Sequence, residues 1–391
     1  MTTTSEINPT FDHTTSKEIQ TSLAKSEALA KNAEILQNAL AEADRRNRAG
    51  KDASDITTSL ATAKAQIPLL THDLHVLSAF VASDKETAIA SGDLDYWSYI
   101  EERKKHPPIS TGFGKLDTLL NGGFDPRTLV IILGAPGGGK TTFTNQMAVH
   151  AADNKRPVLY VTSEDIPMRL LSKTLARKGQ IDYKDVLRGN ADHVIRIKAA
   201  HNEYKQSTAA KLLYYLDATI GCDIETVKKR AIEIFDRHKA NGEGIIVVDY
   251  LQRLARGQAA YKSGNGDVRQ AVTILIEELK AMASDLNCCV IALSAQSRNS
   301  GYGAGSNSLT SAKESGDIEY TADVLMTIGE DDRVPAGPNL KSRVLHIAKN
   351  RQGEEGAIAL DWFGSRQQFT VANAEPMMND NTATNGRGKK R

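Results

Sequence analysis

Cysteines and long apolar runs are scarce in this sequence, and each scarcity excludes a class of protein. The 391 residues contain three cysteines, none of them spaced as C-x-x-C. This pattern argues against both a disulfide framework and a zinc site. No apolar run is long enough to span a bilayer, and the first residues lack the pattern of a signal peptide. We therefore expect a cytoplasmic protein with no membrane contact.

An excess of charge of one sign is also absent. The formal net charge is +1 at pH 7, with 49 Lys and Arg against 48 Asp and Glu. A chain with this balance has no overall basic field that attracts nucleic acid, so any such contact must come from a local group of basic residues. The hydrophobic content of 40% and the charged content of 25% are typical of a globular protein with a substantial core.

The first 92 residues are expected to form a helical region of their own. After a polar start, apolar residues recur at helical spacing from Ser16 onward, and Pro68 interrupts a second helical stretch. Two interpretations stay open for this region. It is either a small helical bundle or hairpin, or an element for oligomerisation or for docking a partner.

Strands and helices are predicted to alternate from residue 108 to residue 371. This domain follows a linker helix over residues 93–107, which ends at the pair Pro107 and Pro108. The alternation predicts an α/β domain around a mostly parallel sheet, with ligands at the carboxyl ends of the strands. The expected strands are 129–133, 157–162, 212–216, 245–249 and 289–294, the helices are 167–178, 223–240 and 268–286, and closing hairpin strands lie at 343–349, 356–362 and 366–371. The polar tail 372–391 ends in a basic cluster and is expected to be disordered.

A glycine-rich loop gives the strongest functional signal. Residues 134–141 satisfy G-x-x-x-x-G-K-[ST] and stand between an apolar strand and the start of a helix. In such a loop, backbone N–H groups and the helix N-terminus bind phosphate oxygens. Lys140 is expected to reach the β- and γ-phosphates of ATP, and Thr141 to hold Mg²⁺. The residues expected to bind ATP are Gly134, Ala135, Pro136, Gly137, Gly138, Gly139, Lys140, Thr141 and Thr142.

Two carboxylates at strand ends complete the predicted site. Asp249 ends an apolar strand and is expected to bind Mg²⁺ through water. Glu164 follows another strand and is the best candidate for the general base that activates the attacking water, with Asp165 beside it as the competing candidate. A carboxylate at either place can instead cap the helix that follows.

Further polar residues are candidates for catalysis. Ser294 and Gln296 come at and after the end of a predicted strand, where a polar group can sense the γ-phosphate. Lys349 and Arg351 are two positions apart on another strand, so their side chains share a face. In a ring they would reach the ATP of the neighbouring subunit, as an arginine finger does. The same spacing is equally typical of two exposed residues on an edge strand.

Five segments of the chain follow one another in a characteristic order. They are residues 108–117, 162–165, 249–252, 312–319 with 322–323, and 348–353. In this order they resemble the opening segment, catalytic glutamate, second Walker motif, single-strand DNA loop and trans-acting lysine and arginine of DnaB-type replicative helicases. The resemblance covers residues 108–371 and implies a RecA-like core in a homohexameric ring that hydrolyses ATP at subunit interfaces and translocates on single-stranded DNA. It also implies DNA contacts from Lys313, Glu314 and Gly316.

The sequence departs from this family at several positions. Lys313 stands where the family usually has arginine, which keeps the charge but loses the bidentate fork. Ala295 separates Ser294 from Gln296, which are adjacent in the family, so either can serve as the sensor. The first hundred residues do not match the family's N-terminal domain. An alternative function therefore stays open: an ATP-gated switch or assembly protein, related to the KaiC and RadA ATPases and without helicase activity.

Overall fold

The computed structural model describes residues 91, 94–219, 221–240, 242–257, 268–295, 320–333, 337 and 339–377. The chain divides into two units, Met1–Asp95 and Tyr96–Arg391, and nearly all of the described residues belong to the second. Most of the predicted helical region, the predicted DNA residues Lys313, Glu314 and Gly316, and Gln296 lie outside the described residues. Within the described part of the chain, no helix combines the length and the apolar character that a bilayer crossing requires.

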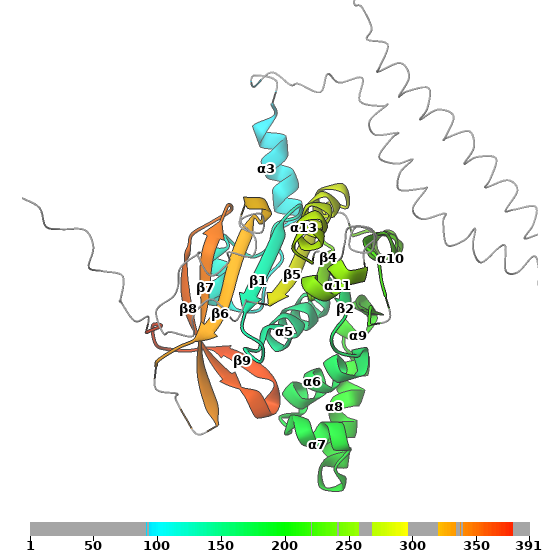
Figure 1. Cartoon of the computed structure of the whole chain (residues 1–391), viewed down its shortest axis with the longest axis vertical. Helices are drawn as coiled ribbons and strands as arrows, with labels where there is room; N and C mark the ends of the chain where they lie inside the picture. Colours follow the sequence, from blue (N-terminus) through cyan, green and yellow to red (C-terminus); the bar gives the residue numbers. More distant parts are fainter. Residues whose placement is uncertain are drawn as a thin grey trace, which may run out of the picture. The chain divides into compact units, whose positions relative to one another are not determined.

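A nine-stranded sheet forms the centre of the second unit (Figure 1). Its spatial order is β3-β2-β4-β5-β1-β6-β7-β8-β9. Every pair from β3 to β6 is parallel, and every pair from β6 to β9 is antiparallel. The strands are β1 (Leu129–Gly134), β2 (Val158–Thr162), β3 (Leu213–Asp217), β4 (Ile245–Asp249), β5 (Cys289–Ala295), β6 (Val324–Glu330), β7 (Leu340–Asn350), β8 (Gly356–Phe363) and β9 (Gln368–Val371).

Helices cover the parallel part of the sheet on both faces. Because a crossover between parallel strands is right-handed, connections that run in opposite directions along the sheet place their helices on opposite faces. The steps β1 to β2 and β2 to β3 run one way, and the steps β3 to β4 and β4 to β5 run the other way. The first group of helices is α5 (Lys140–Asp153), α6 (Pro167–Gly179), α7 (Tyr183–Arg188), α8 (Val194–Gln206) and α9 (Ala209–Leu212). The second group is α10 (Ile224–His238), α11 (Leu251–Gly257) and α13 (Val268–Asp285).

The central strands are buried on both sides, as their sequences require. Every residue of β1, β2 and β4 is buried. A parallel strand covered on both faces reads as a continuous apolar run rather than an alternating one. Helix α10 is capped at both ends. The Asp223 carboxylate accepts from the Thr226 N–H at its start, and Lys239 adopts a left-handed conformation after its last residue.

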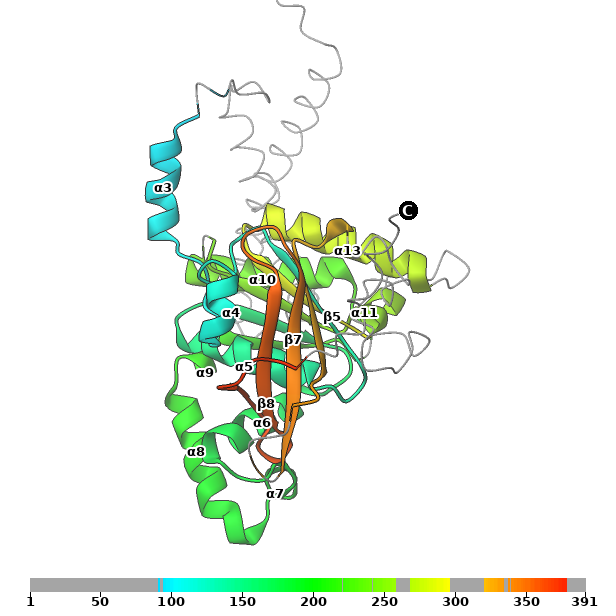
Figure 2. The same cartoon turned by 90° about the vertical axis from the view of Figure 1, so that its left-hand side faces the viewer.

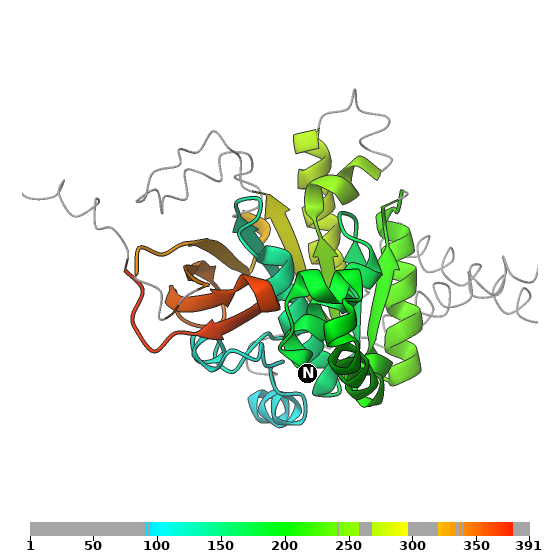
Figure 3. The ribbon, with the colours of Figure 1, turned by 90° about the horizontal axis from the view of Figure 1, so that it is seen from below.

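The closing hairpins form the antiparallel edge. Figure 2 shows β7 and β8 side by side, and in Figure 3 the orange and red strands of this edge lie together at the left of the domain. Strand β9 packs on α5 through the rings of Phe143 and Phe369, whose centroids are 5.5 Å apart. The antiparallel edge is therefore attached to the helix that follows the glycine-rich loop.

The fold class is confirmed, a mostly parallel α/β sheet, and most boundaries agree with the prediction within a few residues. The predicted linker helix corresponds to α3 (Tyr96–Lys105), which contacts the domain through an ion pair of 2.9 Å between Arg103 and Asp125. The predicted disordered tail begins too early. Ala372 is buried and its N–H donates to the Ala359 carbonyl at 2.9 Å, because the pairing of β9 with β8 continues past Val371.

Candidate nucleotide-binding site

The glycine-rich loop joins the end of β1 to the start of α5. Gly137 and Gly139 have φ angles of 75° and 95°, which glycine adopts without strain. At Gly139 a Cβ atom would lie 2.6 Å from Cζ of Phe369. The N–H of Phe143 donates to the Gly139 carbonyl at 2.8 Å and closes the first turn of α5. Glycine at position 139 is therefore required by both the backbone conformation and the packing.

The loop is suited to an anion. Gly139 is the N-cap of α5 and supplies no side-chain acceptor, so the first-turn N–H groups remain directed out of the helix terminus. A helix N-terminus of this kind carries partial positive charge and binds phosphate groups. The Lys140 ammonium lies over the same loop, where it donates to the carbonyls of Gly134 and Ala135 at 2.7 and 3.1 Å. Burial lowers the pKa of Lys140, and the negative charges of Asp249 and Glu164 act against this shift.

Asp249 is the buried acid of the site, with a relative exposure of 3%. Its carboxylate accepts a hydrogen bond of 2.9 Å from the Tyr160 hydroxyl and another from Thr141. Burial raises the pKa of Asp249, and these two hydrogen bonds oppose the shift. A carboxylate beside a threonine hydroxyl is an oxygen donor set of the kind that Mg²⁺ takes. The structure thus brings together the two predicted metal residues.

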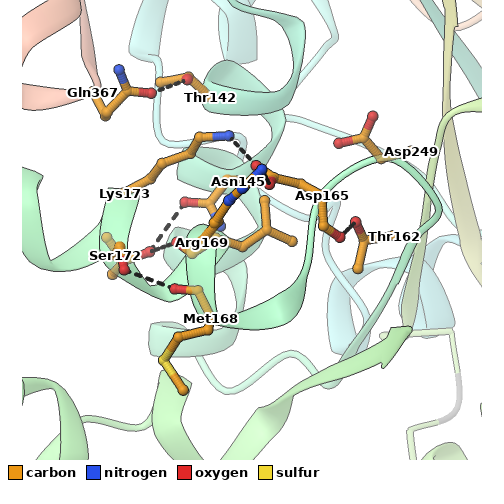
Figure 4. A network of polar contacts seen from close by, with 12 residues as sticks. Thr142, Asn145, Thr162, Asp165, Met168, Arg169, Ser172, Lys173, Asp249 and Gln367 are labelled. Carbon is orange, nitrogen blue, oxygen red and sulfur yellow. Dashed lines mark hydrogen bonds and ion pairs between the residues drawn. The ribbon is translucent and has the colours of Figure 1, made fainter. Parts of the chain in front are cut away.

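The two candidate bases differ in what they contact. Figure 4 shows Lys173 next to Asp165, and the Asp165 carboxylate accepts from Lys173 at 2.8 Å and from Arg169 at 3.3 Å. Glu164 is exposed, and within the described residues its carboxylate makes no hydrogen bond or ion pair. Its negative charge acts on both Lys140 and Asp249. Asp165 is engaged in structural ion pairs, whereas Glu164 is available beside the loop.

Hydrogen bonds connect the carboxyl ends of three neighbouring strands. After β2, the Ser163 hydroxyl donates to the Asp249 carbonyl at 2.9 Å and accepts from the Tyr250 N–H at 3.2 Å. After β4, the Gln252 amide donates to the Ser294 hydroxyl at 2.8 Å and accepts from the Ala295 N–H at 3.3 Å. Strand β5, which carries the predicted sensor residue Ser294, is therefore linked to the segment that follows Asp249.

Sequence reasoning missed a contact between Thr142 and the antiparallel edge. The Thr142 hydroxyl donates to the Gln367 side-chain oxygen at 2.7 Å (Figure 4). Gln146, one turn further along α5, exchanges two hydrogen bonds of 3.0 Å with the backbone of Phe369. The residues involved are more than 200 positions apart, so no local pattern could have indicated the pairing. The edge strand thus fixes the first turn of the phosphate-loop helix.

Lys349 and Arg351 share a face but lie far from the loop of their own chain. Both side chains donate to the Tyr320 carbonyl, at 3.1 and 3.2 Å. The backbone N–H of Arg351 donates to the Asp323 carbonyl, and the backbone N–H of Asp323 donates to the carbonyl of Leu129, at the amino end of β1. The phosphate loop begins at the opposite end of that strand, five residues on, which corresponds to about 16 Å. One chain therefore cannot bring Arg351 to its own phosphate loop.

A glycine-rich phosphate loop after β1, a buried acid at the end of β4, which β5 separates from β1, and this strand order define a P-loop nucleotide-binding domain of RecA-like fold. A family model described as the DnaB-like helicase C terminal domain matches residues 108–371. The chain belongs to this family.

Curated relatives support the assignment. Replicative DNA helicase DnaB of Haemophilus influenzae is 28% identical over 282 residues, which cover 71% of this chain and 58% of the relative. Replicative DNA helicase DnaC of Bacillus subtilis is 28% identical over 264 residues, with 67% and 56% covered. The chain thus matches little more than half the length of these relatives.

Solved structures show the same fold. One that is described as an ATPase domain matches with a TM-score of 0.62 and 23% identity over 74% of this chain and 100% of that chain. A DnaB-like replicative helicase, described with its interactions with primase, matches with a TM-score of 0.61 and 22% identity over 81% of this chain and 77% of that chain.

Proposed function

We propose that this chain is a ring-forming, ATP-dependent DNA helicase of DnaB type, which hydrolyses ATP at subunit interfaces and translocates on single-stranded DNA. Membership of the DnaB-like helicase family supports the class of motor. The observation that carries the proposal is the separation of about 16 Å along β1 between Arg351 and the phosphate loop. A catalytic site that needs both Arg351 and the phosphate loop must be completed by a second copy of the chain.

ATP and Mg²⁺ would be held by residues that already face one another. The loop from Gly134 to Thr142, with the Lys140 ammonium, would bind the phosphates through backbone N–H groups and one cation. Thr141 and Asp249 would hold Mg²⁺, with Asp249 acting through water. When bound, the ion supplies charge neutralisation for the phosphoryl group.

Glu164 would orient and deprotonate the attacking water. Its carboxylate is exposed beside the loop, and Asp165 is bound by Lys173 and Arg169. Lys349 and Arg351 of one subunit would stabilise the charge that develops on the phosphates held by the next. Ser294 or Gln296 would couple the state of the nucleotide to the DNA segment that follows.

DNA contact would come from Lys313, Glu314 and Gly316. Six copies of Lys313 around one channel would follow phosphates without reading the base sequence. The near-neutral total charge is compatible with this arrangement, because the ring concentrates a local charge in the channel. A loader or another replication protein would dock on the helical region before residue 93.

The motor is tested by measuring ATP hydrolysis of assembled rings with and without single-stranded DNA, together with unwinding of a forked duplex. We expect DNA to stimulate hydrolysis and the rings to unwind the fork in the presence of Mg²⁺ and ATP. Binding of the strand should weaken steeply with increasing salt. Rings that hydrolyse ATP at the same rate without DNA and leave the fork intact would contradict the motor and favour an ATP-gated switch.

A further inference from the structure

The Asp323 carboxylate, immediately before β6, connects three segments of the domain. One oxygen accepts from the Leu129 N–H at 2.8 Å and from the Lys280 ammonium at 2.6 Å. The other oxygen accepts from the Arg351 guanidinium at 3.2 Å. The Asp323 side chain is only 9% exposed, so these charge-assisted bonds form in a largely desolvated place.

The Arg351 guanidinium is held at two points although its side chain is 54% exposed. One terminal nitrogen binds Asp323, and the other donates to the Tyr320 carbonyl at 3.2 Å. A guanidinium has five N–H donors in a rigid plane, and these two contacts leave donors for a further ligand. An exposed cation with a fixed plane is suited to bind a group outside its own chain.

The charges around Asp323 also favour an anionic ligand. Arg351 and Lys349, which both donate to the Tyr320 carbonyl, carry two positive charges against the single negative charge of Asp323. Asp323 therefore orients Arg351 without cancelling the positive charge of the group.

We propose that Asp323 is a positioning residue for hydrolysis: it holds the Arg351 guanidinium in the orientation in which it meets the ATP of the neighbouring subunit. This inference rests on the proposed function, in which Arg351 acts between subunits. Asp323 itself touches neither the phosphate loop nor the ATP of its own chain, because it lies at the amino end of β1.

The obvious alternative is that Asp323 only attaches β6 to β1 and to helix α13. Lys280→Met is the matched control, since it removes the other cation on the same carboxylate and leaves Arg351 in place. For Asp323→Asn we expect the kcat of assembled rings to fall about tenfold or more, from the loss of a charge-assisted bond. The KM for ATP should change little. Lys280→Met should keep a kcat near that of the wild type.

A double-mutant cycle separates positioning from structural support. In an Arg351→Ala background, whose small residual turnover is measured at high protein concentration, Asp323→Asn should cause no further loss of kcat, because the two residues act as one unit. A purely structural Asp323 would lower kcat in both backgrounds alike. If Asp323→Asn does not fold, Asp323→Glu replaces it, because glutamate keeps the charge but displaces the carboxylate. We expect it to lower kcat in the wild-type background only.

The outcomes distinguish this inference from the proposed function. If Arg351→Ala rings hydrolyse ATP at the wild-type rate, both proposals fail. If Arg351→Ala lowers hydrolysis strongly while the folded Asp323 variant keeps the wild-type rate, only the inference about Asp323 fails. The inference also fails if Lys280→Met lowers kcat as much as Asp323→Asn does.

Discussion

Lys140 occupies a place where burial disfavours its own charge. Burial lowers the pKa of Lys140 below the ordinary lysine value of 10.5, and bound phosphates would raise it again. Nucleotide binding is then accompanied by proton uptake once the pH exceeds the pKa of the free site. We therefore expect affinity for ATP to decrease as the pH rises, and to do so at a lower pH than for an ordinary lysine.

Titration of a fluorescent ATP analogue from neutral to alkaline pH measures this dependence. Lys140→Arg is the control, because arginine stays charged throughout and its weaker binding should not vary with pH in the same range. An equal loss of affinity in the wild type and in Lys140→Arg would show that another group titrates.

Tyr160 donates a hydrogen bond to the charged form of Asp249. Tyr160→Phe removes this bond, which lowers the free energy of unfolding by about 1 kcal/mol. It also raises the pKa of Asp249 further. Because the carboxylate must be charged to bind the metal, the acidic limb of the ATPase pH profile should move to higher pH. Tyr214→Phe, which loses a 2.8 Å contact with His238 away from the site, should leave that limb in place. An unchanged profile in Tyr160→Phe would contradict the role of Tyr160.

The residues that could be identified from the sequence are those that belong to a local pattern. Lys140 and Thr141 occur in a fixed motif, and Asp249 ends an apolar strand. A local sequence pattern was therefore enough to predict each of them. Gln367 could not be found in this way. It meets Thr142 only because β9 packs on α5, and that contact depends on the whole sheet.

At the scale of elements, the phosphate loop and the antiparallel edge are one packed unit. Gly139→Ala would place a Cβ against Phe369 as well as strain the backbone, whereas Gly137→Ala would meet nothing within 4 Å. Both changes cost about 1–2 kcal/mol for a left-handed conformation. Only Gly139→Ala adds an overpacking cost of about 1–3 kcal/mol. Chemical denaturation should therefore show the larger loss of unfolding free energy for Gly139→Ala, and equal losses would contradict the packing.

The sequence predicted elements well where burial alone determines them. Strands β1, β2, β4 and β5 are apolar runs bounded by turns, and α10 is amphipathic with a capping Asp223. Strand β6 was missed, although residues 324–328 are mostly apolar, because its parallel partner β1 is distant in the sequence. The short helices α7 and α9 were missed because their apolar residues are too few to show a period.

At the scale of the whole molecule, the register of the sheet separates the phosphate loop from Lys349 and Arg351. Parallel pairing of β1 with β6 and antiparallel pairing of β6 with β7 set Lys349 and Arg351 at the amino end of β1. The phosphate loop lies at the carboxyl end of the same strand. Each chain thus offers one half of the proposed catalytic site at each end of β1, so the proposed mechanism requires at least two chains.

The most direct test of this claim mixes two inactive variants. Lys140→Ala leaves Arg351 intact, and Arg351→Ala leaves the phosphate loop intact, so a seam between the two variants can hold one complete site. We predict that each variant alone lacks almost all ATP turnover and that rings assembled from both regain part of it. Mixed rings that stay inactive, or Arg351→Ala rings that hydrolyse ATP at the wild-type rate, would contradict catalysis between subunits.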